Sequence, residues 1–136
     1  MDQLIYRSRA APCLSPAEIF KIIEISARNN PARDITGFLI FGRGEFLQLI
    51  EGPRAALDKL LADLALDPRH TGIEVLARRA IVARTFPEWR MQRLSFDDAS
   101  MDRLRGQFVG KGLATEMVDA VAAFTAARKE LLHTGR

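Results

Sequence analysis

One glutamine, Gln48, lies within residues 45–51, a run that otherwise has the pattern of a strand buried on both faces. Its primary amide carries two hydrogen-bond donors and an acceptor oxygen, and a buried polar group without a partner costs about 1–3 kcal/mol. Either a polar network of the protein or a bound ligand must therefore satisfy this side chain. A glutamine satisfied within the core or at an edge is the ordinary alternative, and Gln48 alone does not decide between the two.

The composition is that of a soluble globular protein, and it excludes several classes of function. The chain has 136 residues, 48% of them hydrophobic, and no apolar run approaches the roughly 20 residues of a membrane span. We therefore expect no membrane partner and a cytoplasmic location. Cys13 is the only cysteine and no His or Cys cluster has metal-ligand spacing, so we expect no metal. The formal charge of +3 is scattered among acidic residues, and we expect no nucleic-acid partner.

Hydrophobic periodicity predicts an alternation of strands and helices up to residue 95. A serine cap, a proline and a glutamate at residues 15–18 form a capping box that begins the first helix. The predicted order is strand 4–8, helix from Ser15 to Asn30, strands 35–41 and 46–50 around a tight turn at 42–44, helix from 54 to Asp67, an extended stretch from Ile73 toward Phe86, and strand 91–95.

This order predicts an α+β, ferredoxin-like βαββαββ fold with a mixed five-stranded sheet and two helices on one face. Alternation along the third strand places Phe46, Gln48 and Ile50 on one face and Leu47 and Leu49 on the other, so both faces must be covered. Two further predicted helices, 101–108 and 115–132, are expected to cover the opposite face. We expect residues 1–95 to form one domain and residues 96–136 a C-terminal helical extension.

Five short motifs follow one another along the first 91 residues. They are Tyr6-Arg7-Ser8, Asn29-Asn30 with Ile35-Thr36-Gly37 just after it, Phe46 to Pro53, Asp67-Pro68-Arg69-His70, and Phe86 to Met91. In this order and spacing they resemble the BLUF family of blue-light sensors using FAD, over about residues 3–95. The resemblance implies that residues 1–95 are a flavin-binding photosensory domain. It also implies a photoreceptor rather than an enzyme, and we expect no enzymatic output domain to follow.

The resemblance implies that FAD lies between the two helices, although FMN or riboflavin is a possible substitute. Tyr6, Gln48 and Asn30 then contact the polar edge of the flavin ring. Excitation draws an electron from Tyr6, whose proton leaves with it by way of Gln48. The Gln48 amide ends either rotated or tautomerised, with a new hydrogen bond to the flavin and a red-shifted absorption. Both alternatives stay open.

The resemblance also implies flavin contacts from the first helix and from the loop after the second helix. The implied contacts are Ser8, Ile22, Ile23, Ser26, Asn29, Asp67, Arg69 and His70. Several of these residues have an ordinary alternative role: helix-to-sheet packing for the isoleucines, a helix end for Asn29, and a polar loop after a helix for the last three.

Trp89 and Met91 match the segment through which the family passes on its signal, and members differ over which of the two side chains packs near the glutamine. We expect the rearranged Gln48 to change their packing, to shift the last strand and to strain the C-terminal helices. The signal then passes to an unidentified downstream protein. Family precedent implies a homo-oligomer such as a dimer.

A light-insensitive ferredoxin-like module that binds a ligand or another protein is the rival hypothesis, since this fold carries many functions. The joint presence of Tyr6, Asn30 and Gln48 distinguishes the photoreceptor from it. A hydrolase is disfavoured because neither His70 nor His133 has an evident nucleophile partner.

Overall fold

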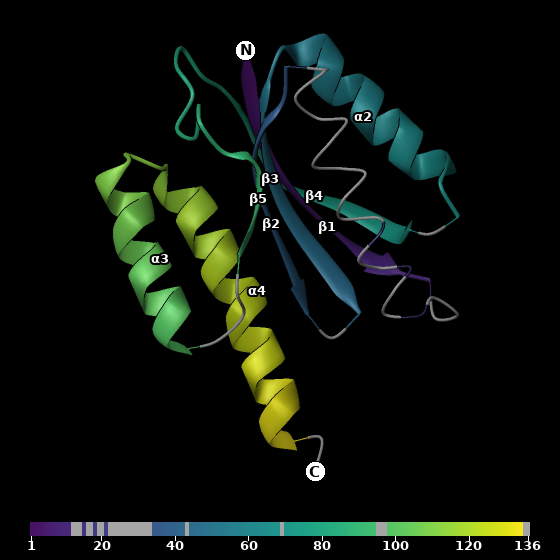
Figure 1. The fold of residues 1–136 in the computed structure, drawn as a ribbon, viewed down its shortest axis with the longest axis vertical. Coiled ribbons are helices and arrows are strands. Elements are labelled where there is room, and N and C mark those ends of the chain that lie inside the picture. Colours follow the sequence, from purple (N-terminus) through teal and green to yellow (C-terminus); the bar gives the residue numbers. More distant parts are fainter. Residues whose placement is uncertain are drawn as a thin grey trace.

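The computed structural model describes residues 1–11, 15, 18, 21, 34–42, 44–68, 70–94 and 98–134. Five strands form one sheet in the order β4-β1-β3-β2-β5 (Figure 1). None of the helices in the described ranges is long and apolar enough to cross a membrane. The elements are β1 (Asp2–Ala10), β2 (Thr36–Gly42), β3 (Glu45–Gly52), α2 (Arg54–Leu66), β4 (His70–Ala80), β5 (Arg90–Leu94), α3 (Asp98–Gly110) and α4 (Thr115–Thr134).

The sheet has a split strand-helix-strand topology. Strand β3 lies between β1 and β2 and is antiparallel to both, while β4 is antiparallel to β1. Strand β5 joins the other side of β2 in parallel. This is the ferredoxin-like arrangement with an added parallel edge strand. The predicted α+β, ferredoxin-like class is confirmed.

Both faces of the sheet are buried, and a different set of helices covers each one (Figure 1). Side chains alternate along a strand, so neighbouring residues of β3 enter different apolar clusters. The cluster on the α2 face contains Leu4, Tyr6, Ile35, Leu39, Phe46, Ile50 and Leu57. The cluster on the α3 and α4 face contains Ile5, Phe38, Ile40, Leu47, Leu49, Phe86, Leu104, Phe108, Leu113, Met117, Val121 and Phe124.

The first predicted helix lies largely outside the described residues, but its beginning is visible. The backbone N–H of Glu18 donates to Ser15 Oγ at 3.2 Å, and the Ser15 N–H donates to Glu18 Oε1 at 3.3 Å. These are the two reciprocal bonds of a capping box. Glu18 and Lys21 are helical, which confirms the predicted start of the helix.

One sequence expectation is wrong: the extended stretch after Ile73 ends at Ala80 and does not continue toward Phe86. Residues 81–89 instead form turns and bends. In this segment, hydrogen bonds to other parts of the chain replace the hydrogen-bond ladder between strands. The first of them is donated by the Ile81 N–H to the Met1 carbonyl at 3.0 Å. Segment 81–89 therefore leaves the sheet edge and crosses to β5.

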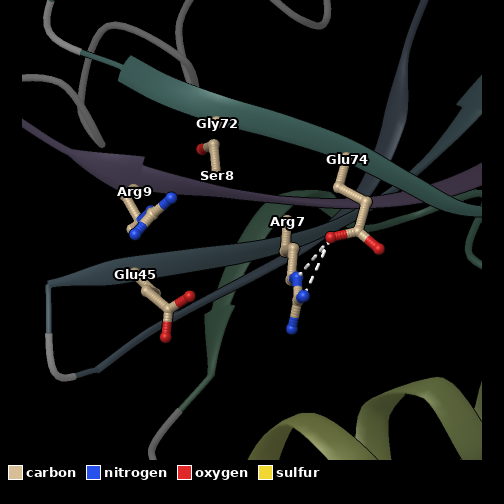
Figure 2. Close-up of a pocket in the computed structure, with 6 residues that line it drawn as sticks. All are labelled: Arg7, Ser8, Arg9, Glu45, Gly72 and Glu74. Carbon is tan, nitrogen blue, oxygen red and sulfur yellow. Dashed lines mark hydrogen bonds and ion pairs between the residues drawn. The ribbon is translucent and has the colours of Figure 1, made fainter.

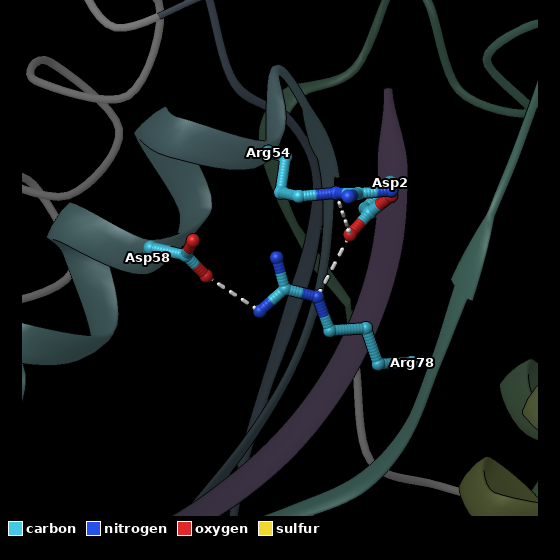
Figure 3. A network of polar contacts seen from close by, with 4 residues as sticks. All are labelled: Asp2, Arg54, Asp58 and Arg78. Atoms are coloured by element: carbon cyan, nitrogen blue, oxygen red, sulfur yellow. Dashed lines mark hydrogen bonds and ion pairs between the residues drawn. The ribbon is translucent and has the colours of Figure 1, made fainter.

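A network of ion pairs joins β1, β4 and α2 at the end of the sheet where the chain begins (Figure 3). Asp2 is buried, and its Oδ2 accepts a hydrogen bond from Arg78 Nε at 2.9 Å and lies 3.3 Å from Arg54 Nε. Arg78 Nη1 also donates to Asp58 Oδ1 of α2 at 2.7 Å. The hydrogen bond from Arg78 lowers the pKa of Asp2 below its usual value; burial opposes this effect and the Arg54 charge supports it.

The lowered pKa of Asp2 predicts an acid-dependent loss of stability. Because its pKa is lower in the folded state, Asp2 stabilises the fold at pH values above its unfolded pKa of about 3.9. This contribution is lost as the pH falls through the folded-state pKa. We expect urea unfolding between pH 6 and pH 3 to show a smaller loss of stability in Asp2→Asn than in the wild type. Asp119→Asn, which changes an exposed carboxylate of α4, is the control and should keep the wild-type slope.

Candidate functional site

Tyr6 and Gln48 lie opposite each other on the adjacent strands β1 and β3. Their side chains are 2% and 5% exposed. The Tyr6 hydroxyl donates a hydrogen bond to Gln48 Oε1. The structure thus brings together the phenol and the amide that the sequence singled out, and it places them in direct contact in a buried part of the core.

Most of the described side chains around this pair are apolar. Leu4 and Ile50 flank it on the same two strands, Leu39 of β2 lies opposite Gln48, and Leu57 of α2 covers the same face. Burial raises the pKa of the Tyr6 phenol above its ordinary value. Tyr6 is therefore neutral throughout the physiological pH range, and its proton is available to Gln48 only when the phenol is made more acidic.

Other residues with predicted flavin contacts are placed in part. Ser8 follows Tyr6 on the same face of β1 and is buried. Asp67 is partly buried at the end of α2, where its N–H donates to the Leu64 carbonyl at 3.1 Å. His70 begins β4 and pairs with Ala10. Ile22, Ile23, Ser26, Asn29, Asn30 and Arg69 lie outside the described residues.

A polar cleft of about 310 Å³ opens beside the second half of β1, which contains Arg7, Ser8 and Arg9 (Figure 2). Arg7 crosses it to Glu74 of β4, with its Nη2 at 2.8 Å from Glu74 Oε2. Ser8 lines this cleft as well as lying on the Tyr6 face. The complete lining is Arg7, Ser8, Arg9, Glu45, Gly72 and Glu74.

Trp89 packs against the cluster on the α3 and α4 face, whereas Tyr6 and Gln48 lie on the α2 face. Its ring centroid lies 4.8 Å from that of Phe86 and 6.2 Å from that of Phe38. Lys111 Nζ, in the turn between α3 and α4, lies 5.4 Å from the Trp89 ring centroid. The structure therefore does not bring Trp89 to Gln48. Met91 lies in β5, beside β2.

Sequence reasoning did not identify Glu51, a fully buried carboxylate of β3. Its Oε2 accepts hydrogen bonds from Gln3 Nε2 at 3.0 Å and from the Thr85 N–H at 2.8 Å. Its Oε1 accepts one from the Phe86 N–H at 2.7 Å. These bonds hold segment 81–89 against β1 and β3. The signal in the sequence was a glutamate at the end of an apolar strand, a pattern that usually indicates a solvent-exposed strand end.

Arg84 is a second residue that sequence reasoning missed, and it holds the same segment. Its Nη1 donates to Thr36 Oγ1 and to the Glu51 carbonyl, each at 2.9 Å. Its Nη2 donates to the Asp34 carbonyl at 2.7 Å. Arg84 thus fixes segment 81–89 to the beginning of β2 and the end of β3.

Comparison with known proteins identifies the class of this site. The family model BLUF, described as sensors of blue light using FAD, matches residues 1–92. The chain is 34% identical over 92 residues to a photoactivated adenylate cyclase subunit beta of Euglena longa, covering 67% of this chain and 11% of that protein. It is also 34% identical over 92 residues to the blue light- and temperature-regulated antirepressor BluF of Escherichia coli strain K12, covering 68% of this chain and 23% of that protein.

A solved structure shares nearly the whole fold. The dark-state structure of BlrB, a BLUF protein, superposes with a TM-score of 0.69 at 33% sequence identity. The match covers 93% of this chain and 94% of BlrB. The chain belongs to the BLUF family, whose members are described as sensors of blue light using FAD.

The chemistry of the described side chains fits a flavin on the α2 face. Gln48 turns its oxygen toward the Tyr6 hydroxyl, so the amide hydrogens of Gln48 point toward other groups. Acceptor atoms at the edge of a flavin ring match these donors, and the apolar side chains around the pair match the ring itself.

Proposed function

We propose that Tyr6 and Gln48 form the light-driven switch of this sensor. The observation that carries the proposal is the hydrogen bond from the buried Tyr6 hydroxyl to Gln48 Oε1. FAD, when bound, supplies the absorption of blue light and, once excited, takes up an electron. Residues of the chain carry out every other step.

Tyr6 gives up an electron, and the phenol thereby becomes a much stronger acid. Its proton moves along the existing hydrogen bond to Gln48. When the electron returns, Tyr6 regains a proton, and the Gln48 amide remains either rotated or tautomerised. The electron returns and Tyr6 regains a proton, so there is no net oxidation or reduction. Rotation leaves every covalent bond of Gln48 unchanged, whereas in the tautomer an O–H bond has replaced one N–H bond of the amide. A changed hydrogen bond from Gln48 to the cofactor then accounts for the red shift.

The rest of the cofactor pocket is assigned from motif positions. We propose that the flavin lies between α2 and the helix that begins at Ser15, with Asn30 at the polar edge of the ring. The proposed further contacts are Ser8, Ile22, Ile23, Ser26, Asn29, Asp67, Arg69 and His70. The buried position of Ser8 on the Tyr6 face supports its assignment.

We propose that residues 1–95 sense light and that residues 96–136 carry the output, without enzymatic activity of their own. The signal passes through Trp89, Met91 and β5 to α3 and α4, and from there to a separate protein in the cytoplasm. Packing of Trp89 against the cluster that contains α3 and α4 residues supports this route. We further propose that the chain acts as a homodimer.

The test is the visible absorption spectrum of the protein purified in darkness, repeated after a blue flash. We expect a bound flavin whose absorption shifts slightly to the red and recovers in darkness. Gln48→Leu should bind flavin and lose the shift, because leucine has neither a donor nor an acceptor. Gln107→Leu, the same exchange at an exposed position of α3, should behave as the wild type.

Either of two results would contradict the proposal. A red shift of wild-type size in Gln48→Leu would remove Gln48 from the switch. A wild-type protein whose bound flavin does not respond to light, or that takes up no flavin, would favour a light-insensitive binding module.

A further inference from the structure

Glu51 is a buried charge that the proposed switch does not use. Burying a carboxylate is costly unless it is well hydrogen-bonded, and Glu51 receives three donors within 3.0 Å. One donor is the Gln3 side chain of β1, and the other two are the backbone N–H groups of Thr85 and Phe86. A single side chain of β3 therefore joins β1, β3 and segment 81–89.

This carboxylate lies close to the switch along the same pair of strands. Gln3 pairs with Glu51 just as Tyr6 pairs with Gln48, three residues further along the ladder. Three residues span about 10 Å, and an odd separation places the two pairs on opposite faces of the sheet. A displacement of β1 against β3 at Tyr6 and Gln48 thus reaches Gln3 and Glu51 through the backbone of both strands.

On its other side, Glu51 holds the residues that position Trp89. The Trp89 N–H donates to the Phe86 carbonyl at 3.3 Å, and the two rings lie 4.8 Å apart. The Phe86 ring also meets Phe108 of α3 edge-on, with centroids 5.8 Å apart. A movement of Thr85 and Phe86 is therefore transmitted to both Trp89 and α3.

We propose that Glu51 is a positioning residue that couples the switch strands to Trp89 through segment 81–89. This inference rests on the proposed switch of Tyr6 and Gln48. The signal crosses the sheet, from the face that holds Tyr6 to the face that holds α3 and α4, and the Glu51 carboxylate is the link between the two. Trp89 receives the change without contacting Gln48.

The single tryptophan of the chain provides a direct readout. Protein labelled with 5-fluorotryptophan has one ¹⁹F resonance, that of Trp89, which is recorded in darkness and under blue light beside the flavin spectrum. In the wild type we expect both the flavin absorption and the resonance to shift. In Glu51→Gln one acceptor oxygen becomes a donor and faces an N–H group. We expect the flavin shift to persist and the light-induced ¹⁹F shift to fall to less than half.

Three further variants make the test specific. Glu74→Gln makes the same exchange in the partly exposed ion pair with Arg7, and its ¹⁹F response should equal that of the wild type. Gln3→Met keeps Glu51 and its two backbone donors but removes the contact of Glu51 with β1. It also removes the 3.2 Å hydrogen bond from Gln3 Nε2 to Thr85 Oγ1, which Thr85→Val removes alone. Gln3→Met should also lower the ¹⁹F response, and it decides the question if Glu51→Gln does not fold.

The outcomes separate this inference from the proposed switch. A ¹⁹F response of wild-type size in folded Glu51→Gln, or in Gln3→Met if Glu51→Gln does not fold, overturns the role of Glu51. A wild type with a normal flavin shift and an unmoved ¹⁹F resonance overturns it as well, and leaves the switch intact. A wild type whose flavin does not respond overturns both.

Discussion

Replacing Tyr6 with phenylalanine is expected to abolish the light-induced red shift while the flavin stays bound. Tyr6 is the only tyrosine in the chain, so no other phenol can supply the electron and proton. The variant also removes the hydroxyl that donates to Gln48 Oε1, which should lower the free energy of unfolding by about 1 kcal/mol. Difference spectra before and after blue light measure the first effect, and urea unfolding measures the second.

Because Tyr6 is the only tyrosine, 3-fluorotyrosine added during expression changes position 6 alone and provides a matched control. It keeps the hydroxyl and its hydrogen bond but lowers the pKa of the phenol. The red shift should therefore persist, with altered rates of formation and recovery. If Tyr6→Phe retained the full shift, Tyr6 would not be the donor.

Gly37→Ala is expected to cost more than about 4 kcal/mol of folding stability, a loss that only severe disruption produces. Gly37 has a φ of 147°, and a Cβ built on it would lie 1.9 Å from the carbonyl oxygen of Leu49. The backbone of β3 would have to move at the residue next to Gln48. Moving Gly37 itself would break its 2.8 Å hydrogen bond to the Trp89 carbonyl. Soluble yield and urea unfolding measure the loss.

Gly106→Ala is the corresponding control. Gly106 lies within α3, and a Cβ there would meet nothing within 4 Å. Alanine should stabilise the helix by about 0.5–1 kcal/mol. If Gly37→Ala unfolded at the same urea midpoint as the wild type, the backbones of β2 and β3 would not approach each other closely enough to exclude a Cβ at position 37.

The chemistry of the central pair was readable from the sequence, but its contact was not. A glutamine inside an apolar strand indicates a demand for hydrogen-bond partners, and the alternation of β3 correctly separates the faces of Gln48 and Leu47. The partner, Tyr6, lies 42 residues away, and nothing in periodicity fixes the register of two strands so far apart. The family motifs supplied that pairing.

The residues that hold segment 81–89 were missed for a physical reason. Pattern reading assigns charged residues to the surface, whereas Glu51 and Arg84 are satisfied by backbone groups of an irregular segment. Such a segment has no period that would reveal its course. For the same reason the sequence left open whether Trp89 or Met91 packs near Gln48, and placed the end of β4 too far along the chain.

The order of the strands in the sheet makes the central strands harder to displace than the edge strands. Strands β1 and β3 each have two hydrogen-bonded neighbours, whereas β5 is an edge strand bonded to β2 alone. Displacing a central strand disturbs two ladders, and displacing β5 disturbs only one. The photochemical groups thus occupy the stiffest part of the sheet, where a small change in one side chain cannot be absorbed locally. Of the two edge strands, β4 and β5, the shorter one, β5, leads toward the C-terminal helices, and it yields at a lower cost in free energy than the central strands.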